Sequence, residues 1–483
     1  MIDLRPVLFI VGILLAVLAS AMTVPAIVDA SLDDRDWSVF AGAAAVTGFF
    51  AASLILATRP AGEIRVNLHQ AFLLTALSWL TISVFGALPF YFSSLEMDFI
   101  DSFFESVSGL TTTGSTVISE LDTRPAGILL WRAIQHWLGG IGIIAMAIAI
   151  LPMLRIGGMQ LFRMESSDRS EKVIPRAAQF AATLLYIYFF FSVACTVAYW
   201  AAGMSFFEAL CHMMATISTG GFSTSDRSLA HFDSATIELI AIVFMLLGAT
   251  SFPLFISVLQ GRWRALWQSQ QFRGFILFIL ITALALALWQ SQSNGTPILT
   301  AFRHALFNVV SIITTTGFAS ADYSLWGGFP VAVFFFLTFV GGCTGATTGG
   351  IKIFRFQVLY AIAMAQIRRL IQPHGVFVPS YENREITDTI ALSVIGFIFV
   401  YGLSFTVLSV ALGLFGLDFT TAVSGAATAL GNVGPGLGDI IGPAGNFAPI
   451  PDGAKLLLAF GMLLGRLEFM TLIIIFLPRF WRH

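Results

Sequence analysis

Residues 302–319 read "FRHALFNVVSIITTTGFA", and this stretch separates two apolar segments that are each long enough to span a membrane. Its first part is mainly apolar but too short to cross a bilayer, because a spanning helix needs about 20 residues. Three threonines then lead into Gly317, and neither stiff β-branched side chains nor glycine favours a helix. The stretch therefore predicts a short re-entrant helix followed by a non-helical turn.

The same pattern occurs four times along the chain. In every copy a phenylalanine stands 15 positions before a glycine. Recurrence at intervals of about 100 residues indicates one structural unit used four times, and we expect each unit to run span, re-entrant helix, glycine stretch, span. The glycines are Gly114, Gly221, Gly317 and Gly434, and the phenylalanines are Phe99, Phe206, Phe302 and Phe419.

The composition is typical of a membrane protein. Of the 483 residues, 57% are hydrophobic and 11% are charged, whereas soluble proteins carry about 25% charged residues. We predict an all-α polytopic protein in a lipid bilayer. A net charge of −2 argues against nucleic-acid binding, and three scattered cysteines indicate neither a disulfide framework nor a metal site. The sequence has no nucleophile–base set and no Walker A motif, so we do not expect an enzyme.

Ten apolar segments are long enough to be transmembrane helices. If all ten cross, the basic connections 155–176, 261–273 and 352–384 lie on one side, and the opposite connections are acidic or neutral. Lysine and arginine mark the cytoplasmic side, so we expect both termini in the cytoplasm. The predicted spans are 5–28, 38–58, 68–92, 128–153, 178–201, 236–259, 273–291, 330–356, 387–414 and 454–478.

The repeats predict four units around one central pore. Non-helical backbone inside a membrane is tolerated where it is buried in protein or lines a water-filled path. A ring of backbone carbonyls can replace the water shell of an alkali cation, and glycine permits the backbone angles and the close approach that such a ring requires. The predicted divisions are two additional N-terminal spans in 1–66, followed by pseudo-symmetric repeats in 67–160, 161–265, 266–375 and 376–483.

Four non-identical span–pore loop–span units with one glycine each resemble the Trk/Ktr/HKT superfamily of cation transporters. The two extra spans and the stretches "LTTTGST", "STGGFST" and "TTTGFAS" resemble its TrkH family in particular. The resemblance covers essentially the whole chain. It implies potassium uptake across the bacterial inner membrane through a channel-like pore, with K⁺ as the transported ion and no covalent cofactor.

The resemblance also implies which residues form a selectivity filter and bind K⁺ through backbone carbonyls. The fourth repeat departs from the Thr-Gly pattern with "GNVGPG", so four-fold equivalence is lost there. One shared glycine per repeat offers fewer carbonyl layers than the TVGYG loops of potassium channels, and we expect a weaker preference for K⁺ and Rb⁺ over Na⁺. The filter residues are Thr112, Thr113 and Gly114; Thr219, Gly220 and Gly221; Thr315, Thr316 and Gly317; and Asn432, Val433 and Gly434.

A glycine-rich stretch interrupts the predicted span 330–356. "VGGCTGATTGGIKIF", residues 340–354, places five glycines in eleven residues, and each costs a helix about 1 kcal/mol relative to alanine. Two interpretations of these glycines are open. They allow close packing of helices, or they belong to an intramembrane loop that gates the pore, as the resemblance implies. Arg466 in the last span either pairs with a carboxylate such as Glu468 or lies at the pore constriction. The implied gate residues are Gly345, Ala346, Thr347, Thr348, Lys352 and Arg466.

Four other polar residues lie in or beside the predicted membrane segments. Arg132 and His136 belong to the fourth span, and Asp101 and Glu208 belong to re-entrant segments. We interpret all four as packing or pore-mouth features, with the two carboxylates attracting cations at the outer entrance.

Control by nucleotide requires another chain, because this sequence carries no nucleotide-binding motif. The resemblance implies a cytoplasmic TrkA-type ring of nucleotide-binding domains, and a homodimer. The basic segments 155–176 and 358–384 are candidate docking surfaces, although the topology of the chain explains their arginines equally well. A potassium symporter coupled to H⁺ or Na⁺ is the alternative function. Such a carrier needs titratable groups at the midplane, and the predicted spans hold few carboxylates, which favours a channel.

Overall fold

The computed structural model describes residues 3–60, 62, 66–149, 173–382, 384–467 and 469–482, and this part of the chain is mostly helical. Six straight helical segments within it are long and apolar enough to cross a membrane. They are α1 (Arg5–Ser31), α2 (Trp37–Thr58), the consecutive pair α3–α4 (Leu68–Gly86 and Leu88–Phe92), α8 (Val173–Ala201), α13 (Gln270–Asn294) and α17 (Asp388–Leu414).

Two further candidate spans are bent at a short break. Helices α10 (Ala235–Ala249) and α11 (Phe252–Leu259) meet at 96°, and α20 (Asp452–Arg466) meets the segment Phe469–Phe476 at 114°. The predicted span 330–356 is not one continuous helix, because α15 (Gly328–Leu337) ends before the glycine-rich stretch and the next helix begins only at Ile353. Helix α6 (Ala126–Ala149) covers most of the predicted span 128–153. The total of ten spans stays a prediction.

The remaining elements are short, apart from α16. Four short helices occupy the positions predicted for re-entrant segments: α5 (Phe99–Leu110), α9 (Phe206–Ile217), α14 (Ile298–Ile313) and α18 (Phe419–Gly431). The others are α12 (Arg264–Gln268), α16 (Ile353–Ile371), α19 (Gly438–Ile441) and α21 (Phe469–Ile473), with 3₁₀ turns at Leu121–Thr123, Ser228–Phe232, Tyr323–Trp326, Ile474–Phe476 and Pro478–Trp481. Two-residue strands pair as β1 (Val340–Gly341) with β2 (Ile351–Lys352), parallel, and as β3 (Ser380–Tyr381) with β4 (Arg384–Glu385), antiparallel.

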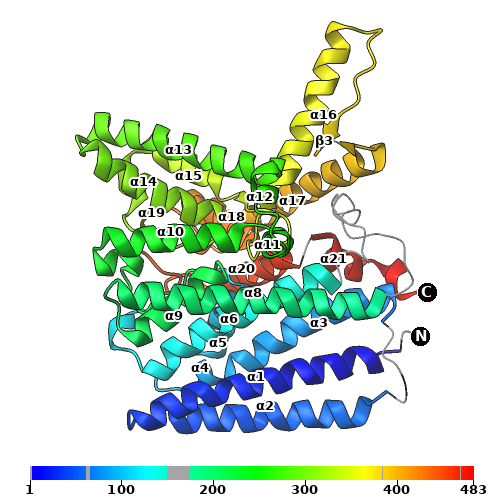
Figure 1. Ribbon diagram of the computed structural model, residues 1–483. Helices are drawn as coiled ribbons and strands as arrows, with labels where there is room; N and C mark the ends of the chain where they lie inside the picture. The colour runs from blue at the N-terminus through cyan, green and yellow to red at the C-terminus, as the bar shows by residue number, and fades with distance from the viewer. Residues whose placement is uncertain are drawn as a thin grey trace.

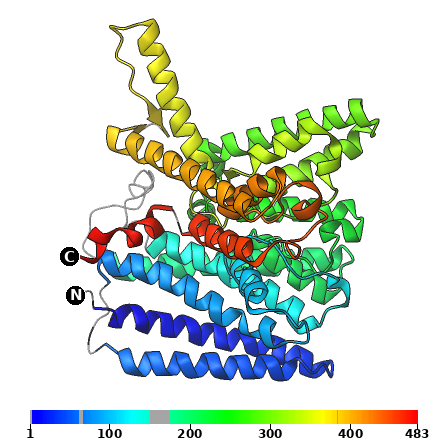
Figure 2. The same cartoon turned by 180° about the vertical axis from the view of Figure 1, so that it is seen from behind.

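The two N-terminal helices form one flank of the molecule. Helices α1 and α2 lie side by side, and α1 packs against α3 and α6 (Figures 1 and 2). Both chain termini lie at the same end of the molecule (Figures 1 and 2). There the Gln70 amide donates a 2.7 Å hydrogen bond to the Asp3 carbonyl, and the rings of His69 and Phe480 lie 5.1 Å apart. This arrangement agrees with an even number of membrane crossings.

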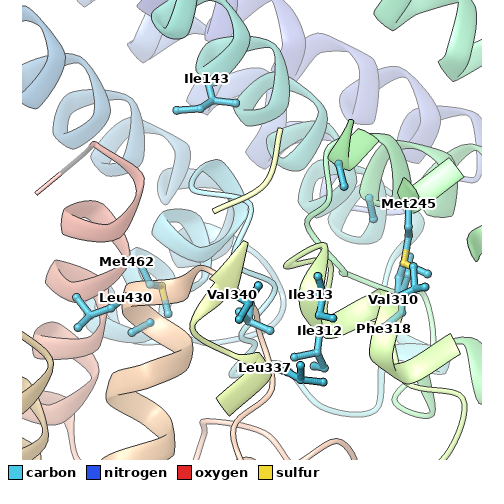
Figure 3. Packing of buried hydrophobic residues seen from close by; sticks show 14 of the residues in the cluster. Ile143, Met245, Val310, Ile312, Ile313, Phe318, Leu337, Val340, Leu430 and Met462 are labelled. Atoms are coloured by element: carbon cyan, nitrogen blue, oxygen red, sulfur yellow. The ribbon is translucent and has the colours of Figure 1, made fainter. Parts of the chain in front are cut away.

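One hydrophobic cluster connects the short helices with the longer ones. Figure 3 shows part of it, with side chains from several elements gathered around the glycine-rich stretch. The outer faces of the helices are also apolar: on α17, Leu392, Phe399 and Leu414 are each more than two thirds exposed. Extended exposed apolar surface of this kind fits contact with lipid rather than water. The members of the buried cluster that are labelled in Figure 3 are Ile143, Met245, Val310, Ile312, Ile313, Phe318, Leu337, Val340, Leu430 and Met462.

Helix α16 projects from the rest of the molecule as an arm, and the β3–β4 hairpin lies beside the base of this arm (Figure 1). A separate small hydrophobic cluster holds its base against α17, with Phe354 and Val358 packed beside Ile390 and Val394. Beyond this base the helix is largely exposed, and Leu370 and Ile371 are among its most exposed residues. The arm therefore presents both charged and apolar side chains away from the body.

Candidate ion-conduction site

Local sequence signals explain where the short helices begin. Asp98, Ser205 and Asp418 stand immediately before α5, α9 and α18, and each side chain accepts a hydrogen bond from a backbone N–H in the first turn. Hydrogen bonds from Thr421 hold the pKa of the Asp418 carboxyl below its usual range. Helix α14 begins earlier, at Ile298, because Pro297 precedes it and proline tolerates a helix start. Three of the four helices thus start at the repeated phenylalanine.

The backbone after each short helix follows one path. Two residues before each repeat glycine, the chain turns into the left-handed region, which is uncommon for β-branched residues such as threonine and marks strained, often functional, positions. The glycine itself also has a positive φ. The angles are 51° at Thr112, 55° at Thr219, 53° at Thr315 and 52° at Asn432, followed by 86° at Gly114, 82° at Gly221, 82° at Gly317 and 110° at Gly434.

The residue between these two positions is bonded in the same way in every repeat. Its N–H donates to a carbonyl five residues earlier, inside the short helix. These bonds are Thr113 to Ser108 (2.9 Å), Gly220 to Ala215 (2.8 Å), Thr316 to Ser311 (2.9 Å) and Val433 to Thr428 (3.1 Å). The fourth repeat therefore keeps the backbone of the others despite its different residues, and asparagine suits its left-handed position well.

The four segments close into a ring, here named the glycine ring and defined as residues 112–114, 219–221, 315–317 and 432–434. A Cβ atom on any of the four glycines would collide with a carbonyl oxygen of the next segment. The order of contact is cyclic and returns to its start. Gly114 faces the Gly220 oxygen, Gly221 the Thr316 oxygen, Gly317 the Val433 oxygen and Gly434 the Thr113 oxygen. Every predicted filter residue thus lies within one closed assembly.

The side chains of the ring are less symmetric than its backbone. In the first and third segments, two threonine hydroxyls pair beside the ring, at 2.7 Å between Thr111 and Thr113 and 2.8 Å between Thr314 and Thr316. The fourth segment uses Asn432 instead. Its amide donates to the Thr113 hydroxyl at 3.0 Å and to the Met462 carbonyl at 2.9 Å, so it ties the fourth segment to the first and to α20.

Residues 340–352, here named the 340–352 loop, lie directly against the ring. The parallel pairing of β1 and β2 holds the two ends of the loop together. The Thr347 hydroxyl donates to the Gly248 carbonyl at 3.0 Å and lies 3.2 Å from the Thr219 hydroxyl. The Gly349 N–H donates to the Thr315 hydroxyl at 2.8 Å. The loop therefore contacts the second and third ring segments through hydrogen bonds.

Arg466 approaches the same loop from the end of α20. Its guanidinium is buried, and Nη1 donates to the Thr347 carbonyl at 2.8 Å. Its Nε and Nη2 atoms have no hydrogen-bond partner among the residues that the structure describes. The predicted alternative partner Glu468 lies outside those residues. Lys352 bonds within the loop, to the Thr348 carbonyl and hydroxyl.

A family model for TrkH, described as a cation transport protein, matches residues 38–483. This chain belongs to the TrkH family. It is 47% identical to the Trk system potassium uptake protein TrkI of Halomonas elongata, over 99% of this chain and 97% of the relative. It is 39% identical to the Trk system potassium uptake protein TrkH of Escherichia coli K12, over 99% of both chains. The family that the sequence predicted is confirmed.

The fold is that of the TrkH family as well. The structure superposes on the crystal structure of the potassium transporter TrkH from Vibrio parahaemolyticus with a TM-score of 0.91, over the whole of both chains at 36% identity. At this level of identity and coverage the polytopic, mostly helical architecture is shared.

The acidic residues predicted at the entrance of this TrkH-family chain have local partners. Asp101 forms an ion pair with Lys455 on α20, at 2.5 Å between Oδ1 and Nζ. Glu208 accepts a 3.0 Å hydrogen bond from the Ser205 N–H and so completes the capping box of α9. The described contacts of both carboxylates are structural.

Sequence reasoning missed one buried group beside the ring. Glu105 lies within α5, is fully buried and pairs with Arg132 at 2.8 Å. A charged residue in the middle of a re-entrant segment was a usable signal, since burial of an unpaired carboxylate is costly. Its partner lies 27 positions away in sequence, on α6, so only the fold reveals the pair.

Proposed function

We propose that this TrkH-family chain takes up potassium across the bacterial inner membrane through the glycine ring, which acts as a channel-like selectivity filter. The cyclic contact of four glycines with four neighbouring carbonyls is the observation that carries the proposal. The names of its relatives, which are potassium uptake proteins, support the choice of ion. The division into two N-terminal spans and four repeats, 67–160, 161–265, 266–375 and 376–483, belongs to the same proposal.

The chemistry of the ring suits an alkali cation. Backbone carbonyls substitute for water around K⁺, and the negative C-terminal ends of four short helices favour a positive charge nearby. K⁺ is then the transported ion and no cofactor is required. Because each repeat supplies one glycine turn, few carbonyl layers are available, and K⁺ and Rb⁺ are preferred over Na⁺ by a modest factor.

The 340–352 loop and Arg466 act as the gate of this pore. The loop is hydrogen-bonded to ring residues Thr219 and Thr315, and the Arg466 guanidinium donates to the Thr347 carbonyl of the loop. A positive charge beneath the ring opposes the passage of cations. Opening then requires the loop, including Gly345 and Ala346 at its tip, to leave these contacts.

The decisive experiment is cation flux into liposomes that contain this protein alone, with K⁺, Rb⁺ or Na⁺ gradients at a clamped pH. Passive flux in the order K⁺ ≈ Rb⁺ > Na⁺ is expected. Flux that requires a proton or sodium gradient contradicts the channel mechanism and leaves coupled symport. The matched control is the same liposome preparation without protein.

The arm formed by α16 is the proposed docking surface for a cytoplasmic TrkA-type nucleotide-binding ring, and the chain works as a homodimer. Helix α16 projects from the body (Figure 1), and its last turn carries the exposed residues Arg368 and Arg369 beside exposed apolar side chains, which supports this use of the arm. The other predicted docking segment, 155–176, lies almost entirely outside the described residues.

Charge reversal on this arm tests the docking surface. Arg368→Glu is expected to weaken binding of a purified TrkA-type protein by about threefold to tenfold at low salt, since exposed charges contribute modestly to affinity. Flux of the isolated protein is expected to stay unchanged. Arg273→Glu, at an exposed position of the body, is the matched control. Equal binding by both variants and the parent protein contradicts docking at the arm.

A further inference from the structure

Each short helix is tied to the chain that leaves the ring. In three repeats, the residue nine positions before the glycine is polar and buried, and it bonds a residue two or three positions after the glycine. In the fourth repeat Gly425 takes that position, and the neighbouring Ser424 hydroxyl accepts from the Leu437 N–H at 3.0 Å. The other ties are Glu105 to Thr116 and Val117 (both 2.9 Å), His212 to Ser223 (3.0 Å) and Asn308 to Ser320 (3.1 Å).

The tie in the first repeat is the one built on an ion pair. Arg132 of α6 contacts Glu105 at 2.8 Å, with both side chains buried. The same guanidinium donates to the Thr116 hydroxyl at 3.0 Å and to the Ser223 carbonyl at 2.9 Å. It also stands over the Phe222 ring, 4.1 Å from the centroid. One side chain therefore bridges the segments that leave the ring after Gly114 and after Gly221.

His136 lies one turn further along α6 and holds the same two repeats. Its Nε2 accepts from the Phe222 N–H at 3.1 Å, which leaves Nδ1 as the donor to the Gly109 carbonyl at 2.7 Å. The imidazole stacks on the Phe222 ring with centroids 4.1 Å apart. A Cβ atom on Gly220 would collide with this imidazole, so the ring segment fits closely against it.

We infer that Glu105, Arg132 and His136 form a positioning brace that sets the preference for K⁺ over Na⁺ by fixing the first two segments of the glycine ring. The inference rests on the proposed role of the ring as a filter. Selectivity depends on where carbonyl oxygens stand. The three side chains bond the chain before and after the first segment and the chain after the second segment. A buried ion pair adds little net stability compared with apolar residues but specifies geometry. The third and fourth segments are held by neutral groups.

Loss of the Glu105 charge tests the brace. Glu105→Gln keeps the shape but leaves Arg132 without its carboxylate, and the ratio of K⁺ to Na⁺ flux in liposomes is expected to fall by about tenfold, mainly through increased Na⁺ flux. The matched control is Glu238→Gln. That buried carboxylate pairs with Arg303 at 3.2 Å and joins α10 to α14 near their first turns. The control is expected to keep the parental ratio.

A milder pair of variants covers the case in which Glu105→Gln does not fold. The Thr116 hydroxyl donates to Glu105 and accepts from Arg132. Thr116→Val removes it and is expected to lower the ratio several-fold, whereas Thr116→Ser retains it and is expected to restore the parental value. A merely structural role predicts no difference in ion ratio between folded Val and Ser variants, and that result overturns the brace.

Failure of the brace and failure of the filter give different results. If Gly317→Ser alters the K⁺ to Na⁺ ratio while folded Glu105→Gln and Thr116→Val do not, the ring is a filter and the brace is wrong. If none of these variants alters the ratio, the ring does not select ions and the proposed function fails together with the brace.

Discussion

Replacement of Gly317 by serine is expected to lower the ratio of K⁺ to Na⁺ flux by about tenfold or more. A non-glycine residue in a left-handed conformation costs roughly 1–2 kcal/mol, and the serine Cβ would also collide with a carbonyl oxygen. The φ of Gly317 is 82°, and an added Cβ would collide with the Val433 oxygen and lie 2.8 Å from Pro435 Cδ. The strain is expected to move that oxygen, which is one of the four carbonyl oxygens that face the repeat glycines. The measurement is initial K⁺ and Na⁺ flux in liposomes.

Gly402→Ser is the matched control for this substitution. Gly402 lies within α17, and a Cβ atom there would meet nothing within 4 Å. This variant is expected to retain the parental ion ratio and flux. A folded Gly317→Ser protein with an unchanged ratio contradicts the placement of the ion path at the ring. Equal loss in both variants indicates general damage to the fold.

The sequence predicted the four short helices and the turns that follow them, because the determinants of both are local. A glycine turn and the short, mainly apolar helix before it both leave a clear trace in the residue pattern. The fourth repeat shows the limit of reading by residue identity. Asn432 replaces threonine there, yet the backbone is the same, since asparagine adopts the left-handed conformation readily.

Long-range contacts could not be predicted in this way. The glycines of 340–354 indicated a break in the helix, but not the bond from Thr347 to Gly248, which joins two repeats, or the bond from Gly349 to Thr315, which joins residues 34 positions apart. Neither partner carries a pattern that identifies the other. The 114° bend after Arg466 was likewise missed, because the residues on both sides of it are as apolar as those of a straight span.

The second large effect is expected at the gate. Arg466→Met is expected to raise partner-free K⁺ flux by about tenfold or more, because it removes a buried positive charge beside the ion path and the bond to the Thr347 carbonyl. Methionine fills similar volume in an apolar site, so the variant is expected to fold. The measurement is the initial rate of K⁺ uptake into liposomes without any regulatory protein.

Thr347→Val separates the loop contact from the charge. It removes the hydroxyl that donates to Gly248 and lies beside Thr219, while its backbone carbonyl still faces Arg466. Flux is expected to rise less than in Arg466→Met. The effect of the double variant, expressed as a free energy, is expected to be smaller than the sum of the two single-variant effects, because both substitutions loosen the same loop. The control is Thr196→Val, which is expected to leave flux unchanged. Thr196 is a buried threonine of α8 that bonds only within its helix in the described contacts.

Unchanged or reduced flux in folded Arg466→Met contradicts a gate at this position, since removal of a closed barrier can only increase passive uptake.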